Sequence, residues 1–214
     1  PGTSASTSFV ATEWLDQLYV AIRTETLSPP VASRLIGYFG VALYESVVPG
    51  MPGSRSLGRQ LNGLGDLPDA PSDTVHWPAA ANAAVAEVLS GLLAAGSVPT
   101  LTAIEALEDD LEAVVGVNIS AEILTRSQTF GTSIGVAILD WASADGFTQW
   151  NNCAYVVPTG PGLWEPTPPG FAASPLQPCW GNMRPFCMLF ASEYAGNGNG
   201  MHSDANSMQK GRML

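Results

Sequence analysis

The sequence predicts an all-α protein: a helical bundle of about five helices, wrapped by a long ordered ribbon rich in Pro, Gly and Trp, with a disordered C-terminal tail. Three observations support this class. Hydrophobic residues make up 46% of the 214 residues and charged residues only 13%, a composition that can build a sizeable core. Apolar residues recur at helical spacing as far as residue 144. Beyond residue 146 Pro, Gly and aromatic residues dominate, and only residues 154–157 resemble a short strand.

The first two helices follow from local signals. Residues 1–10 are small and polar and are interpreted as a flexible lead-in to a helix at residues 13–25. The second helix begins at "LSPP", where Ser28 suits the N-cap. Pro29 and Pro30 suit the first turn, because a missing N–H costs little there. Within this helix Gly37 and Gly40 lower the helix propensity, which predicts that another helix packs closely against them.

Three more helices follow a long loop at residues 49–75. The third begins at "HWPAAANAA", and Thr102 with Glu105 predicts a capping box at the start of the fourth. The fifth covers residues 120–144, and the following Asp-Gly pair is a stop signal. The helical region with its ribbon is therefore expected at residues 11–190, followed by a disordered or aberrant tail at 191–214.

The charge balance argues against several partners. The formal net charge is −11 and Lys210 is the single lysine, whereas nucleic acids and anionic membranes require a basic face. No run approaches the roughly 20 apolar residues that span a bilayer. We therefore expect no nucleic-acid partner and no membrane span, and we leave open a homo-oligomer.

The three cysteines do not define a disulfide framework. Cys179 and Cys187 could pair in an oxidising compartment, and buried free thiols are the alternative, with Cys153 as the third residue. The localisation stays open, with an extracytoplasmic site slightly favoured.

No assembled active site is visible among the candidate residues. His76 precedes Trp77 at a helix start, which indicates a capping or packing role. His202 with its neighbouring Asp is too small a set for a metal site, and "GNGNG" lacks the strand and Lys of a phosphate loop. The acids of the fourth helix are typical of a solvated face. Arg184, between aromatics and a proline, could hold an oxyanion but is better explained by a structural role.

Four stretches together resemble the N-terminal part of bacterial vanadium-dependent haloperoxidase-like proteins, in the superfamily of type-2 phosphatidic acid phosphatases and vanadium haloperoxidases. They are "RTETLSPPVASRLIGYFGVALYESVVPGMPG", "SLGRQLNGLGDLP", "HWPAAANAA" and "PTGPGLWEPTPPGFAASPLQPCWGNMRPF", in this order. Their marker residues are interpreted as structural motifs: Ser28, Pro29, Pro30, Tyr44, Glu45, His76, Trp77, Trp164, Pro168, Pro169, Trp180, Gly181, Arg184 and Pro185.

The resemblance implies an α-helical bundle and, for the full-length family, a vanadate or phosphate centre. The family builds this centre from a Lys-to-Arg-Pro segment, a Ser-Gly-His segment and a final Arg-plus-His segment, which supply oxyanion donors, a nucleophile or vanadium ligand, and an acid-base group. None of these segments is found in this sequence, and Arg184-Pro185 belongs to the ribbon instead. We therefore expect no catalytic, cofactor-binding or metal-binding residue in this chain.

The leading hypothesis is that the chain is the N-terminal, non-catalytic half of a vanadium haloperoxidase-like protein, inactive alone, whose partner is a missing C-terminal catalytic half. A truncated gene or an incomplete gene model would give this appearance. Two alternatives stay open: the same fold from an acid phosphatase-type parent, and a stand-alone helical scaffold or binding module. The ribbon is expected to wrap the bundle, with Trp164 and Trp180 as apolar anchors.

Overall fold

The computed structural model describes residues 4–193, with side chains from residue 8 onward. The helices are α1 (Ser4–Thr24), α2 (Pro29–Glu45), α3 (Trp77–Leu92), α4 (Val98–Val115), α5 (Ala121–Ser143) and the short α6 (Phe147–Trp150), with 3₁₀ turns η1 (Val48–Gly50) and η2 (Trp180–Asn182). The all-α prediction is confirmed, because the described residues contain no strand, including residues 154–157. The chain divides into two units, Pro1–Ala144 and Asp145–Leu214.

The start of α2 confirms the role predicted for its prolines. Ser28 occupies the N-cap in extended backbone geometry, and Pro29 and Pro30 fill the first turn, although the Ser28 side chain makes no capping hydrogen bond. A proline in the first turn does not sacrifice a helical hydrogen bond, since the N–H groups there have no intrahelical acceptor. The same device starts α4, where a proline again follows the N-cap.

Two predicted helix starts are wrong. The first helix begins at Ser4, so most of the expected lead-in at residues 1–10 is helical, and Val10 is fully buried. The fourth begins at Val98, a full turn before the predicted capping box. Its N-cap Ser97 donates from its hydroxyl to Glu25 Oε1 at 2.6 Å. This long-range bond to the end of α1 has no local sequence signature.

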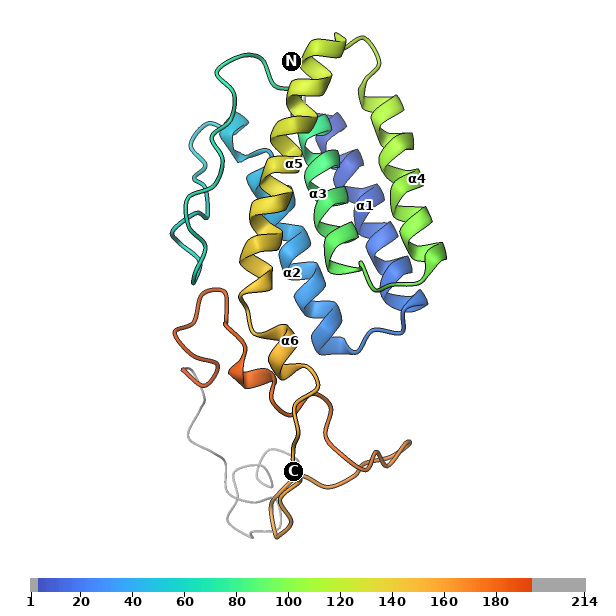
Figure 1. The fold of residues 1–214 in the computed structure, drawn as a ribbon, viewed down its shortest axis with the longest axis vertical. Coiled ribbons are helices and arrows are strands. Elements are labelled where there is room, and N and C mark those ends of the chain that lie inside the picture. Colours follow the sequence, from blue (N-terminus) through green and yellow to red (C-terminus); the bar gives the residue numbers. More distant parts are fainter. Residues whose placement is uncertain (1–3, 194–214) are drawn as a thin grey trace, which may run out of the picture. The chain divides into compact units, whose positions relative to one another are not determined.

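Helix α3 lies at the centre of the first unit. It packs against α1, α2, α4 and α5, and most extensively against α5 (Figure 1). Its small side chains make this possible, because small residues let helix axes approach closely. The buried ones are Ala79, Ala80, Ala81, Ala83, Ala84 and Ala86.

A close helix approach uses two glycines of α5, whereas Gly40 of α2 has open space around it. A Cβ added at Gly131 would lie 2.8 Å from the carbonyl carbon of Ala80, and one at Gly135 would lie 2.9 Å from the carbonyl oxygen of Ala84. At Gly40, by contrast, an added Cβ would meet nothing within 4 Å. The prediction of close packing at Gly40 is therefore wrong.

One polar chain crosses the core between three helices. The buried Trp14 of α1 donates from Nε1 to Asn82 Oδ1 of α3 at 2.8 Å. Asn82 in turn donates from Nδ2 to the backbone oxygen of Glu108 in α4 at 2.9 Å. A buried amide with both ends bonded fixes the register of these helices, because a shifted helix would leave a polar group unpaired.

Residues Pro29–Gly50 are long and apolar enough to cross a membrane by length and composition alone, contrary to our expectation that no run of that kind exists. Their apolar side chains include Leu35, Tyr38 and Phe39, which are buried in the core of the first unit. A core helix of a bundle meets the same criterion.

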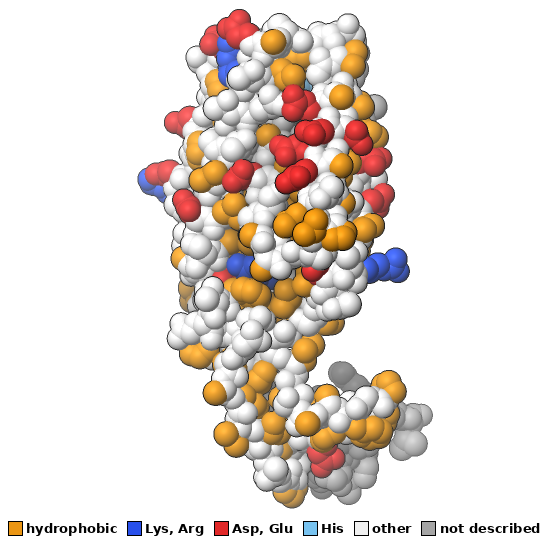
Figure 2. Space-filling model, turned by 45° about the vertical axis from the view of Figure 1, so that its right-hand side comes forward, with side chains coloured by type: hydrophobic (Ala, Val, Ile, Leu, Met, Phe, Trp, Pro, Cys, Tyr) orange, Lys and Arg blue, Asp and Glu red, His pale blue; other side chains and the backbone are white. Residues whose placement is uncertain are grey.

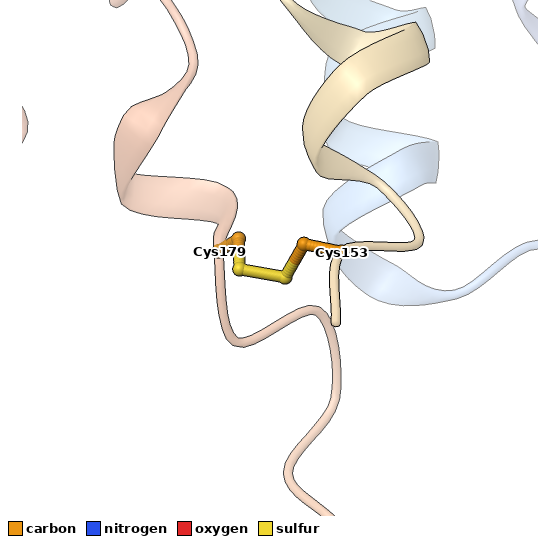
Figure 3. Close-up of a disulfide and its surroundings, with 2 residues drawn as sticks. All are labelled: Cys153 and Cys179. Atoms are coloured by element: carbon orange, nitrogen blue, oxygen red, sulfur yellow. A yellow bond between two sulfur atoms is a disulfide. The ribbon is translucent and has the colours of Figure 1, made fainter. Parts of the chain in front are cut away.

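The second unit contains the ribbon, whose described part ends at residue 193. Residues 151–179 form turns and irregular backbone closed by a disulfide between Cys153 and Cys179, with their Cα atoms 6.2 Å apart (Figure 3). Both alternatives considered for the cysteines, a Cys179–Cys187 pair and buried free thiols, are therefore wrong, and Cys187 is a free, exposed cysteine. Nearness in sequence favoured the wrong partner, because the fold returns the ribbon to the segment after α6. The wrapping of the bundle stays a prediction, and the tail at 194–214 lies outside the described residues.

Candidate functional site

The end of α2 holds the long loop at residues 51–76 in place. Tyr44 donates from its hydroxyl to the backbone oxygen of Arg55 at 2.8 Å. The next residue, Glu45, is only 2% exposed, and its Oε1 accepts the backbone N–H of Leu57 at 2.6 Å. These two motif residues therefore fix the middle of the loop against the helix that precedes it.

The start of α3 fixes the other end of the loop. The backbone N–H of His76 donates to Ser127 Oγ of α5 at 2.8 Å. Trp77 packs edge-on against Phe130, with ring centroids 6.3 Å apart. A Cβ added at Gly50 would lie 2.7 Å from Cζ2 of Trp77, so only glycine allows this ring to pack against the 3₁₀ turn.

The His76 ring takes a packing role. It is half-buried at the N-cap of α3 and makes no capping hydrogen bond. Burial lowers the pKa of His76, because the charged ring loses hydration. Its Nδ1 is buried without a hydrogen-bond partner. The packing alternative predicted for His76 therefore fits the structure better than side-chain capping.

The loop and the bundle line a partly open pocket of about 460 Å³. Its apolar wall comes from Val48 and Pro49 of η1, Ile134 of α5, and Leu67 and Pro68 of the loop. Its polar wall comes from Glu45, Ser56, Asp66 and Asp69. The family-like stretches include Glu45 and Asp66, but sequence spacing alone does not show that residues 66–69 return to the end of α2.

The ribbon motifs lie in the second unit. Trp180 packs edge-on against Phe147, with ring centroids 6.2 Å apart, and the backbone N–H of Arg184 donates to the backbone oxygen of Asp145 at 3.0 Å. The peptide bond between Pro168 and Pro169 is cis. Gly181 is exposed and Pro185 is half-buried, close in sequence to the buried Met183.

Trp164 is 39% exposed and lines a second pocket, of about 550 Å³. Tyr155, Pro175 and Leu176 share this wall with amide side chains from the turn after α6. Within its own unit Trp164 is thus an open aromatic surface and not a buried anchor.

The acidic residues of the fourth helix gather on one face of the first unit (Figure 2). Glu105 and Asp109 are exposed, as predicted for a solvated face, but Glu108 is half-buried. Burial raises the pKa of Glu108, and the nearby acids Asp109, Glu112, Glu87 and Glu105 raise it further. No three His, Cys, Asp or Glu side chains are grouped for a metal ion among the residues that the structure describes.

Vanadate or phosphate would require convergent Arg, Lys or N–H donors together with histidine. Three arginines of the described part make other contacts. Arg34 donates to the backbone oxygen of Ala142 and lies over the Tyr38 ring, and Arg59 pairs with Asp66. Arg126 contacts Glu122 at 2.9 Å. These three arginines are therefore engaged elsewhere and do not converge on a tetrahedral oxyanion site, and His202 lies outside the described residues.

Comparison with known proteins identifies the fold. No family model matches the chain, and no curated protein does. Among solved structures, it is similar to the first bacterial vanadium-dependent iodoperoxidase, with a TM-score of 0.80 and 25% sequence identity. The similarity covers 95% of this chain and 48% of the iodoperoxidase chain. The chain therefore has a haloperoxidase-like fold and spans about half the length of that enzyme.

Proposed function

We propose that this chain is the non-catalytic helical half of a vanadium haloperoxidase-like protein. In this proposal a second segment or subunit supplies the oxyanion-binding residues, and the complete protein oxidises halide with peroxide at a vanadate centre. The chain itself acts as the scaffold on which the catalytic half folds. It has no turnover alone.

The observation that carries the proposal is the partial match. The alignment uses 95% of this chain but only 48% of an iodoperoxidase. A whole enzyme of that fold thus has room for a second half of similar length. The chain carries a net charge of −11, and Arg34 and Arg126 are engaged in structural contacts, which supports placing the anion site in another segment.

The ribbon offers the surface that a catalytic half would cover. Large apolar side chains are partly open to solvent along the disulfide-closed segment, and burying the rest of each one contributes up to roughly 1.5–3 kcal/mol. They are Tyr155, Val156, Leu163, Trp164, Phe171 and Leu176. An extended surface of this kind is typical of an interaction site.

The first test is an activity assay. The purified chain is incubated with orthovanadate, hydrogen peroxide and iodide, and triiodide is followed by its absorbance. We expect the rate of the protein-free control. Vanadate-dependent triiodide formation above that control would refute the non-catalytic role.

Two further assays separate the alternatives. An acid phosphatase-type parent is tested by sequencing the coding DNA beyond Leu214 in all frames, then assaying any longer product with halide and with p-nitrophenyl phosphate. A stand-alone scaffold predicts a monodisperse chain that binds little of a hydrophobic dye. A half-protein with an uncovered ribbon binds the dye and scatters light as it self-associates.

A further inference from the structure

We propose that the pocket between the end of α2 and the long loop binds a small organic ammonium ion. The pocket is formed wholly within the first unit, so this inference does not depend on the proposed function. The ligand is identified by three features: the size of the cavity, the buried carboxylate of Glu45, and the apolar residues that share the lining.

The cavity has the dimensions of a ligand site. Its volume of about 460 Å³ falls in the range of small-molecule pockets, roughly 300–1,000 Å³. Val48 and Ile134 contribute buried side chains, 5% and 1% exposed, to the apolar wall. Such a wall accommodates the hydrocarbon part of a ligand and not a fully hydrated ion.

Glu45 supplies the charged contact. It is 2% exposed and lines the cavity, and one N–H group, from Leu57, is bonded to its Oε1. A carboxylate has about four acceptor sites on its two oxygens, so it retains capacity for a further donor. A buried carboxylate is costly unless it is paired, and an ammonium ligand supplies both the charge and the N–H donors.

The remaining lining strengthens the preference for a cation. Asp69 and Asp66 lie on the loop side of the cavity, and Ser56 adds a hydroxyl group. Arg59 bonds to Asp66, and that contact lowers the pKa of the Asp66 carboxyl group. No arginine or lysine lines this pocket. An anionic ligand would therefore meet like charges, whereas a monocation would be attracted to Glu45 and Asp69.

A metal cation is the weaker occupant. Calcium takes 6–8 oxygen ligands at 2.3–2.6 Å, and magnesium requires near-octahedral geometry. No group of three metal-binding side chains exists among the described residues, and part of this lining is hydrocarbon. An amine with a short apolar body matches both the acidic and the apolar residues of the lining.

The probe is n-butylammonium, with n-butanol as its uncharged counterpart, measured by isothermal titration calorimetry on the full chain. The decisive variant is Glu45→Gln, because an amide oxygen still accepts the Leu57 N–H while the charge is removed. We expect the wild-type chain to bind n-butylammonium more tightly than n-butanol. Glu45→Gln should weaken n-butylammonium binding by about tenfold or more, since hydrogen bonds to charged groups contribute about 1.5–3 kcal/mol.

A second variant keeps the test valid if Glu45→Gln fails to fold. Asp69 is exposed, so Asp69→Lys should fold normally and abolish binding by placing a positive charge at the pocket. Asp110→Asn, an exposed α4 acid, is the charge control and should bind as the wild type does. The inference is overturned if n-butylammonium does not bind, if a folded Glu45→Gln and Asp69→Lys bind it unchanged, or if calcium binds in its place.

Discussion

The contact between α3 and α5 makes the sharpest prediction about stability. An alanine at Gly131 would place its Cβ 2.8 Å and 2.9 Å from the carbonyl carbon and Cα of Ala80, and closer still to its carbonyl oxygen. Ordinary carbon–carbon contacts are about 3.5–4.0 Å, so the two backbones must separate by roughly 0.6 Å or more. Backbone atoms of a buried helix cannot rotate away as a side-chain end can.

The expected magnitude follows from two opposing effects. Overpacking of a core costs about 1–3 kcal/mol, and the clash with backbone places Gly131→Ala at the upper end. Replacing glycine by alanine inside a helix returns up to about 1 kcal/mol. We therefore expect Gly131→Ala to lower the free energy of unfolding by about 2 kcal/mol.

Gly40→Ala is the matched control, because it is the same chemical change at an exposed helical glycine whose added Cβ meets nothing within 4 Å. It should raise the free energy of unfolding by about 0.5–1 kcal/mol. Urea unfolding followed by far-UV circular dichroism compares the two midpoints at equal slope. If Gly131→Ala unfolds at or above the wild-type midpoint, or matches Gly40→Ala, the close helix contact does not exist.

Three further predictions concern single contacts. Cys153→Ser removes the disulfide, whose two residues are 26 positions apart, and should destabilise the second unit by about 3.5 kcal/mol. Proteolysis of the ribbon measures this loss, and Cys187→Ser is the control that should change little. Glu108→Gln should raise the urea midpoint at pH 7, because the raised pKa means that ionising this carboxyl group destabilises the fold. This gain in midpoint should shrink as the pH falls through the raised pKa of the folded state and vanish below the unfolded-state pKa of about 4.5. Trp14→Phe should lower the free energy of unfolding by about 1–3 kcal/mol in urea titrations, since it leaves the Asn82 oxygen without its donor.

The sequence predicted features that depend on neighbouring residues. Pro29 and Pro30 suit a helix start after a suitable cap, and the predicted start of the fifth helix near residue 120 is confirmed, with Ser120 accepting the N–H of Ile123 at 3.3 Å. The end of the fifth helix is equally local, because Gly146 takes a φ of 88° that glycine adopts without strain.

Features set by distant segments were not predicted. Gly40 and Gly131 look alike in sequence, and only the position of Ala80 decides which one is packed against backbone. The start of α4 is fixed through Glu25, which is distant in the chain and whose pKa is lowered by the hydrogen bonds it accepts from Ser97 and Thr100. The pairing of Cys153 with Cys179 likewise depends on how the ribbon returns.

The surroundings of Glu45 also depend on distant segments, and the sequence identified this residue only as part of a motif. Its carboxylate serves the fold by accepting the Leu57 N–H, and a glutamine would serve that purpose equally well. A neutral residue would also avoid the cost of burying a charge beside a cavity. The presence of glutamate at a site that is 2% exposed thus favours a role for the charge itself, and an ammonium ligand gives it one.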